Sequence, residues 1–202
     1  MNILNSTNKP DFNYPKTVST NAVADLKKAS TNGDKPLLVD ALLRYYIAQQ
    51  MISNDYHKEV IDTIEQFRIA ETQPDYKAIL ALIEIDAYNN AYTNCRNYSN
   101  QEVHEQYPDD LSEWNKLDFE RKNDELRAMV LENKDALRQH KLSEYSKSIK
   151  VPAQSKEVFT TLLDFAYSKL YDIHHDSGML NDWLNESGNN VATDIYIKTQ
   201  LI

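Results

Sequence analysis

A helical pattern that occurs twice, 38 residues apart, constrains this fold more than any other feature of the sequence. In the first copy Asp34 stands where a helix N-cap is expected, and Pro36 follows in the first turn, where its missing N–H costs nothing. The second copy has Thr72 and Pro74 at the same two places. The apolar stripes align as well, pairing Leu26 with Ile64, Leu42 with Leu80 and Tyr45 with Ile83. Because cap, proline and stripe repeat together, the sequence predicts two stacked helical hairpins.

Each of the four helices carries apolar residues at the i, i+3, i+4 spacing of one helix face. Gly33 is expected to end the first helix at the C′ position, and residues 53–55 to form a turn and cap before the third. The stripes are Ala22, Val23, Leu26 and Ala29; Leu38, Ala41, Leu42, Tyr45 and Ala48; Val60, Ile61, Ile64 and Phe67; and Tyr76, Ile79, Leu80, Ile83 and Ala87. The predicted fold is all-α, a short α-solenoid that is tetratricopeptide-like in shape but lacks that repeat's Gly and Trp signature.

Residues 17–186 are predicted to form this helical domain, after a flexible, proline-interrupted tail at 1–16. A polar connection is expected over 93–111, and Ser112 is expected to cap a fifth helix. That helix would bury Trp114, Leu117, Phe119, Leu126, Met129 and Val130. A further helix is expected from about Ser155, with Val158, Leu162, Phe165, Ala166 and Leu170 inward.

Residues 187–202 behave differently, since apolar and polar side chains alternate there with the period of a strand. An isolated C-terminal strand has no predicted partner in a helical chain. Three interpretations stay open: a frayed tail, an edge strand paired with an unrecognised segment, or the first strand of a following β-domain.

Composition excludes several classes of function. The formal net charge is −9, which argues against nucleic acid or an anionic membrane surface as partner. Three glycines cannot form a phosphate-binding glycine loop, and one cysteine, Cys95, can form neither an intramolecular disulfide nor a multi-cysteine zinc site. No apolar run approaches the ~18 residues of a membrane span.

No catalytic, cofactor-binding or metal-binding residue is predicted. The adjacent His174 and His175 would point about 100° apart on a helix, so they are interpreted as a polar helix end rather than as a metal site or the base of a hydrolase. Cys95 has no evident histidine partner and is interpreted as an incidental thiol. Carboxylate pairs are interpreted as solvated helix faces; they are Asp109 with Asp110, Glu84 with Asp86, and Asp118 with Glu120.

The candidate interaction surface consists of Tyr88, Tyr92, Arg96 and Tyr98, in a segment rich in Tyr and Asn. Tyr88 and Tyr92 share a helix face and could anchor a partner protein or stack on a sugar. The alternative is that their rings pack against the following helix while the hydroxyls reach water, and we favour this packing.

Four stretches resemble the N-terminal helical region of the α2-macroglobulin-like proteins of the Bacteroidetes. The first, NAVADL at 21–26 with KPLLVDAL at 35–42, is similar to that family's opening helical hairpin. The others are QPDYKAILALI at 73–83 with YNNAY at 88–92, DLSEW at 110–114 with Phe119, and SKEVFTTLLDFA at 155–166. They span roughly residues 17–172, and all are packing motifs.

The resemblance implies a periplasmic or cell-surface envelope protein whose longer chain carries macroglobulin β-domains and, in some members, a thioester that traps proteases. The thioester motif Cys-x-Glu-Gln is missing, since Cys95 is followed by Arg96, Asn97 and Tyr98. No active residue of the family therefore maps onto this sequence. The expected function is a non-catalytic interaction or spacer module whose partners are other domains of a longer chain and proteases. The alternative is a free-standing adaptor that binds a peptide or glycan in a groove lined by Tyr45, Tyr88 and Tyr92.

Overall fold

A computed structural model describes residues 13–93, 102–146, 149, 159–174 and 183. Within these residues there are seven α-helices, two 3₁₀ turns and no strand, so the predicted all-α fold is confirmed. The helices are α1 (Pro15–Asn32), α2 (Lys35–Ile52), α3 (His57–Ala70), α4 (Pro74–Thr93), α5 (Lys116–Glu132), α6 (Lys134–Gln139) and α7 (Leu162–His174). The 3₁₀ turns are η1 (Leu111–Glu113) and η2 (Leu142–Tyr145).

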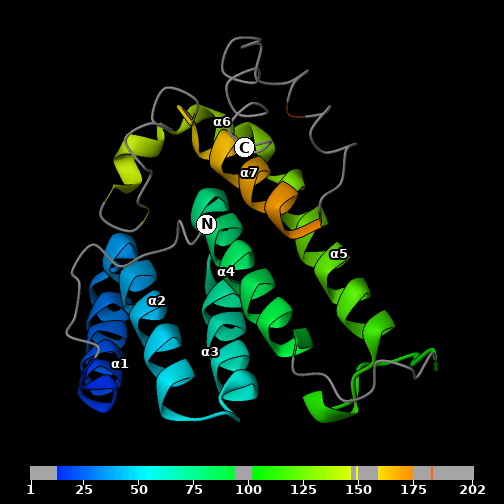
Figure 1. Ribbon diagram of the computed structural model, residues 1–202. Coiled ribbons are helices and arrows are strands. Elements are labelled where there is room, and N and C mark those ends of the chain that lie inside the picture. The colour runs from blue at the N-terminus through cyan, green and yellow to red at the C-terminus, as the bar shows by residue number, and fades with distance from the viewer. Residues whose placement is uncertain (1–12, 94–101, 147–148, 150–158, 175–182, 184–202) are drawn as a thin grey trace, which may run out of the picture.

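The two predicted hairpins are α1 with α2 and α3 with α4, which lie beside each other in Figure 1. Two of the predicted local signals are confirmed, at Asp34 and Gly33, but the predicted cap over 53–55 is wrong, since Tyr56 is the N-cap of α3 and makes no side-chain capping bond. Asp34 caps α2 by accepting a hydrogen bond of 3.1 Å from the Leu37 N–H, and Gly33 has the left-handed φ of 67° that glycine adopts without strain. The start of α1 differs from the prediction, because Pro15 and Lys16 from the expected tail form its first turn.

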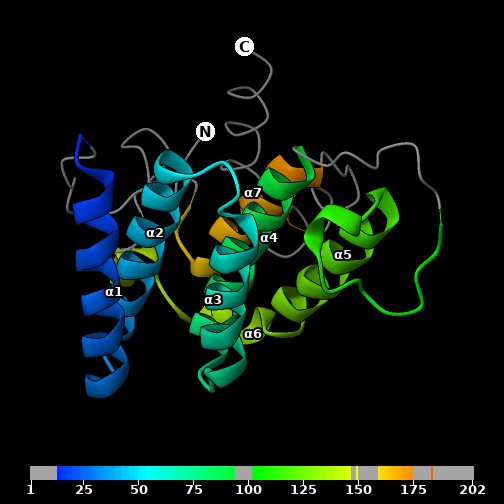
Figure 2. The same cartoon turned by 90° about the horizontal axis from the view of Figure 1, so that it is seen from below.

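Helix α4 lies at the centre of the molecule and contacts α2, α3, α5, α6 and α7. Figures 1 and 2 show α5 on one side of it, and Figure 1 shows α7 above it. Its buried residues extend around the whole circumference, including the carboxylates Asp75 and Glu84. A helix in this position needs no wide polar face, which explains why the sequence over 78–85 is almost entirely apolar.

The fifth helix begins later than predicted. Asn115, not Ser112, is its N-cap: the Asn115 side chain accepts bonds from the N–H groups of Leu117 and Asp118, and the Asp118 carboxylate accepts from the Asn115 N–H at 3.0 Å. This reciprocal capping box satisfies more donors than a serine four residues before the helix could. With the helix in this register, Leu117 is 38% exposed, so its predicted burial is wrong.

The start of the last helix is also corrected. Residues 159–161, expected to be helical, are extended, and Thr161 forms an antiparallel bridge with Lys141. Helix α7 begins at Leu162, where Asp164 accepts bonds from Thr160 and Thr161 through both backbone and hydroxyl donors. The predicted inward residues Leu162, Phe165, Ala166 and Leu170 are buried as expected. The predicted strand over 187–202 and the helix start at Ser155 lie outside the described residues.

Candidate interaction surface

Tyr88 is placed in the core rather than on a surface. Its side chain is 4% exposed, and its ring stacks on Trp114 with centroids 5.3 Å apart and planes 14° apart. The Phe119 ring of α5 meets the Tyr88 ring edge to face, with centroids 6.4 Å apart. Burial is the main cause that raises the pKa of the Tyr88 hydroxyl above its usual value, and the nearby Glu84 carboxylate adds to the shift. Tyr88 therefore joins α4 to α5.

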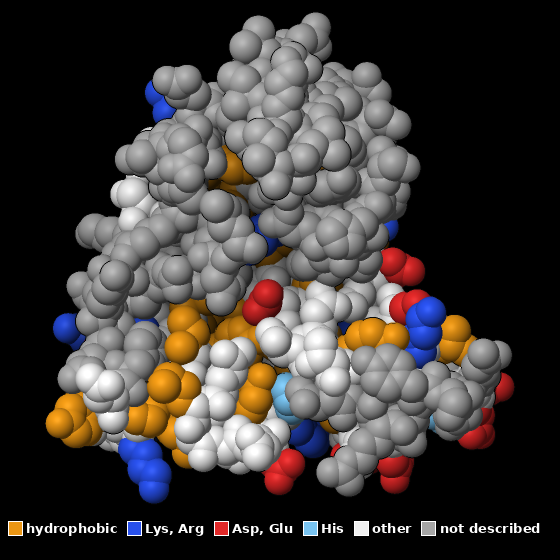
Figure 3. Space-filling model, in the orientation of Figure 1, with side chains coloured by type: hydrophobic (Ala, Val, Ile, Leu, Met, Phe, Trp, Pro, Cys, Tyr) orange, Lys and Arg blue, Asp and Glu red, His pale blue; other side chains and the backbone are white. Residues whose placement is uncertain are grey.

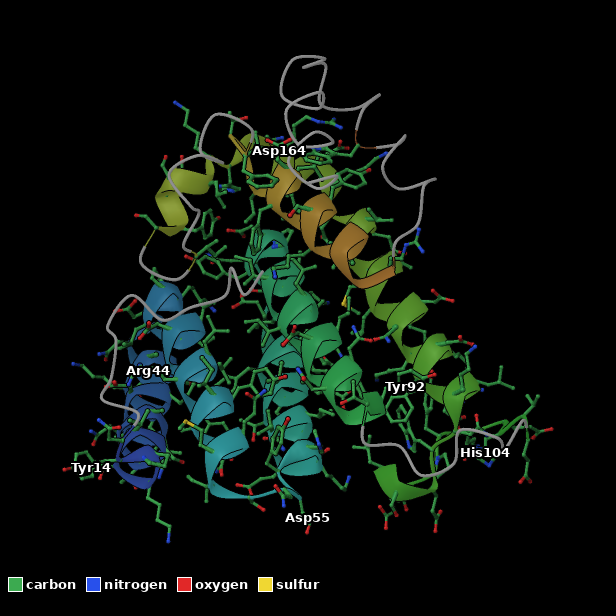
Figure 4. All side chains as sticks on the ribbon, viewed as in Figure 1. Tyr14, Arg44, Asp55, Tyr92, His104 and Asp164 are labelled. Atoms are coloured by element: carbon green, nitrogen blue, oxygen red, sulfur yellow. The ribbon has the colours of Figure 1, made fainter. Side chains whose placement is uncertain are left out.

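Tyr92, one turn further along α4, is half-buried, and its ring centroid lies 5.5 Å from that of Phe119. Figure 4 shows it between the end of α4 and α5. Arg96 and Tyr98 lie outside the described residues. Both described members of the predicted surface therefore contact α5, which agrees with packing as the favoured alternative.

The aromatic cluster continues into the loop before α5, through a residue that sequence reasoning missed. The Tyr107 ring stacks on Trp114, with ring centroids 4.7 Å apart. The Arg121 guanidinium lies 4.1 Å from the centroid of the Tyr107 ring. Burial first, and then the hydrogen bond to Glu125, raise the pKa of Tyr107 to about 12. A tyrosine followed by proline inside a polar stretch gives no periodic signal, so the sequence pattern could not identify it.

Two carboxylates that were predicted to be solvated are buried instead. Glu84 is fully buried and pairs with Arg68, whose Nη2 also lies 3.1 Å from Glu65. Asp118 is 1% exposed and caps α5. The prediction is wrong for these two because α4 is enclosed on every side and because the α5 capping box turns Asp118 inward. Asp86 is partly buried and accepts from Tyr46 and Asn90, whereas Asp109, Asp110 and Glu120 are exposed, as expected.

Two histidines in the described part of the chain, His104 and His140, each lie beside a carboxylate. His104 Nδ1 lies 2.8 Å from the capping carboxylate of Asp118, and Arg121 donates to the His104 carbonyl at 2.6 Å (Figure 4). Among the described residues, no group of three His, Cys, Asp or Glu side chains could hold a metal ion. His174 ends α7, while His175 and Cys95 lie outside the described residues.

A groove of about 450 Å³ lies between α1 and α3, with Tyr45 of α2 in its lining. Its other lining residues are Val23, Leu26, Lys27, Ser30 and Thr31 of α1, and Thr63 and Phe67 of α3. Val23 was predicted to be part of the core stripe, but it is 37% exposed at this groove. Tyr45 thus borders a groove, whereas Tyr88 and Tyr92 contact α5, so the three tyrosines of the adaptor hypothesis do not line one surface.

The surface over the first hairpin has apolar side chains at several points, seen in Figure 3 over α1 and α2. No helix in the described part of the chain combines the length and apolarity that a membrane span requires. Comparison of the whole chain with protein families, with characterised proteins and with solved structures finds no match.

Proposed function

We propose that this chain is a non-catalytic helical module that acts through protein contacts or as a spacer, and that it is the N-terminal part of a bacterial α2-macroglobulin-like protease inhibitor. The observation that supports a non-catalytic role is the use of the buried ionisable groups. Arg68 and Glu84 join α3 to α4, and Lys35 and Glu71 join α2 to the start of α4. Tyr145 donates to Asp75 across 70 residues of sequence. Each of these pairs joins one helix to another segment, which supports a structural use of these ionisable groups.

The family part of the proposal rests on the resemblance of the four packing motifs. The resemblance implies that the protein lies in the cell envelope, either in the periplasm or at the cell surface. It also implies that its partners are proteases and other domains of the longer chain. The order of helices α1 to α4 supports it, because the opening hairpin and the proline-started helix α4 form as the resemblance implies.

The test is the coding sequence that follows the codon of Ile202. Continuation into long β-rich domains is the expected result, and a Cys-x-Glu-Gln motif further on would indicate covalent trapping of proteases. A stop codon directly after Ile202 would contradict the macroglobulin proposal.

The second candidate is a free-standing adaptor. The position of Tyr45 in the groove between α1 and α3 favours it, since an aromatic ring beside apolar and hydroxyl side chains is typical of a binding surface. A stop codon after Ile202, together with binding at this groove, would support the adaptor.

A further inference from the structure

We propose that the groove between α1 and α3 binds an amphipathic α-helix of a protein partner, with an acidic side chain of that helix beside Lys27. The inference rests on the proposed non-catalytic role, in either of its two forms, and names the class of partner that the module takes. Figure 2 shows the arrangement, with α2 between α1 and α3.

The hydroxyl groups of the groove favour apolar contacts over a glycan or an extended peptide. Thr31 donates to the Lys27 carbonyl at 2.9 Å, and Thr63 donates to the Glu59 carbonyl at 2.7 Å. The Tyr45 hydroxyl donates to the Glu59 carboxylate at 2.6 Å. These three donors are already used, so among the lining hydroxyls Ser30 alone is left to donate to a sugar or to a strand backbone, both of which need several new hydrogen bonds when water is displaced. An α-helix satisfies its own backbone and needs only apolar surface.

The shape of the groove suits a helix of about two turns. The α1 wall extends from Val23 to Thr31, which at ~1.5 Å per residue is about 12 Å. Apolar side chains at positions i, i+3 or i+4, and i+7 of a bound helix cover that length. Val23 and Phe67 are partly exposed on opposite walls and would contact these side chains.

The 38-residue repeat gives an independent argument for a helix. The equivalents of Val23, Lys27 and Ser30 in the second hairpin are Ile61, Glu65 and Arg68. Ile61 is buried, and the other two contact α5. On α5, Lys122 Nζ lies 3.0 Å from Glu65 Oε1, and Met129 Sδ lies 3.6 Å from Arg68 Nη1. Part of the face that is open as a groove on the first hairpin is therefore covered by α5 on the second, while Ile69, the equivalent of Thr31, is 67% exposed.

The same comparison specifies the charge of the partner. Where the second hairpin has Glu65 facing Lys122, the first has Lys27, so the complementary residue is an acid. Among the described residues that line the groove, Lys27 is the one charged side chain. Helix α1 also carries Lys16 and Lys28, and its single acid, Asp25, pairs with Arg44 at 2.7 Å.

The experiment is a selection with a defined probe: a phage library of 18-residue helical peptides with a fixed apolar stripe and randomised charge positions, panned on the full chain. We expect enriched peptides with Asp or Glu beside the stripe. Lys27→Glu should weaken their binding about fivefold, and Val23→Asp should weaken it about tenfold or more. Lys28→Glu is the matched control, since it makes the same change of charge on α1 but does not line the groove, and it should leave binding unchanged.

Circular dichroism and thermal melting of each variant establish that it remains folded. If Val23→Asp unfolds the chain, the comparison of peptide binding between Lys27→Glu and Lys28→Glu still tests the inference. Failure to enrich acidic helices, or equal effects of Lys27→Glu and Lys28→Glu, would overturn the inference. The proposed function is tested separately by the downstream coding sequence, so the two can fail independently.

Discussion

Lys35 and Glu71 connect the beginnings of α2 and α4: Lys35 Nζ lies 2.6 Å from Glu71 Oε2, although the two residues are 36 positions apart. The other carboxylate oxygen of Glu71 accepts from the backbone N–H groups of Thr72 and Gln73 at 2.8 and 2.9 Å. One buried carboxylate thus satisfies donors at the start of α4 and joins the two hairpins at equivalent points of the repeat.

Glu71→Ala is expected to destabilise the fold by about 1–2 kcal/mol, since it removes the carboxylate that caps two backbone N–H groups at the start of α4. Urea unfolding followed by circular dichroism measures this. The matched change is Lys35→Met, which removes the partly exposed partner but leaves the Glu71 carboxylate its two backbone donors, so it should cost less than Glu71→Ala. Equal losses for the two variants would show that the cap contributes nothing.

Arg68→Ala should cost about 3–5 kcal/mol, because it leaves the fully buried Glu84 without its compensating charge. The double variant Arg68→Leu with Glu84→Leu should recover most of that loss, since no charge remains buried. Urea midpoints of the wild type, the single variant and the double variant test this. A double variant as unstable as Arg68→Ala would contradict the account.

Trp114→Ala should cost about 3–5 kcal/mol, because the indole lies between the rings of Tyr88 and Tyr107 and its removal opens a cavity between α4 and α5. Leu117→Ala, three residues later, should cost under about 1 kcal/mol because Leu117 is 38% exposed. Thermal melting of the two variants is the measurement. A large loss for Leu117→Ala would indicate that α5 is rotated relative to the register described above.

Alkaline unfolding is expected above pH ~10, the ordinary pKa of tyrosine. Burial raises the pKa of Tyr76 and Tyr107 to about 12 and also raises that of Tyr88. A raised pKa in the folded state gives stability that is complete below pH ~10 and is lost as the pH rises through the folded value, since the unfolded chain releases its protons first. Unfolding followed by circular dichroism should therefore coincide with tyrosinate absorbance.

The control for this pH dependence is Tyr88→Phe, which removes one of the ionising groups and keeps the stacked ring. Its alkaline midpoint should lie higher than that of the wild type, with a similar free energy of unfolding at pH 7. An unchanged midpoint would contradict the linkage.

Much of the first half of the fold could be predicted because its signals are local. Asp34, Gly33 and Pro74 act through hydrogen bonds and φ angles within a few residues. The N-cap of α2, the end of α1 and the start of α4 are therefore decided by the local sequence. The buried stripes of α2 follow from the same periodicity. For the candidate site, the i, i+4 spacing put Tyr88 and Tyr92 on one face, but no local rule states which helix covers that face.

What the sequence alone determined is therefore the helical hairpin repeat, since helix caps and apolar periodicity depend on neighbours along the chain. Only the tertiary structure decided the burial of Glu84 and the exposure of Val23. Each of these depends on a segment distant in sequence: Arg68 and Lys122 around Glu84, and α3 opposite Val23. A buried charge or an open groove is a property of what packs against a helix, and that is determined by contacts that periodicity within the helix does not encode.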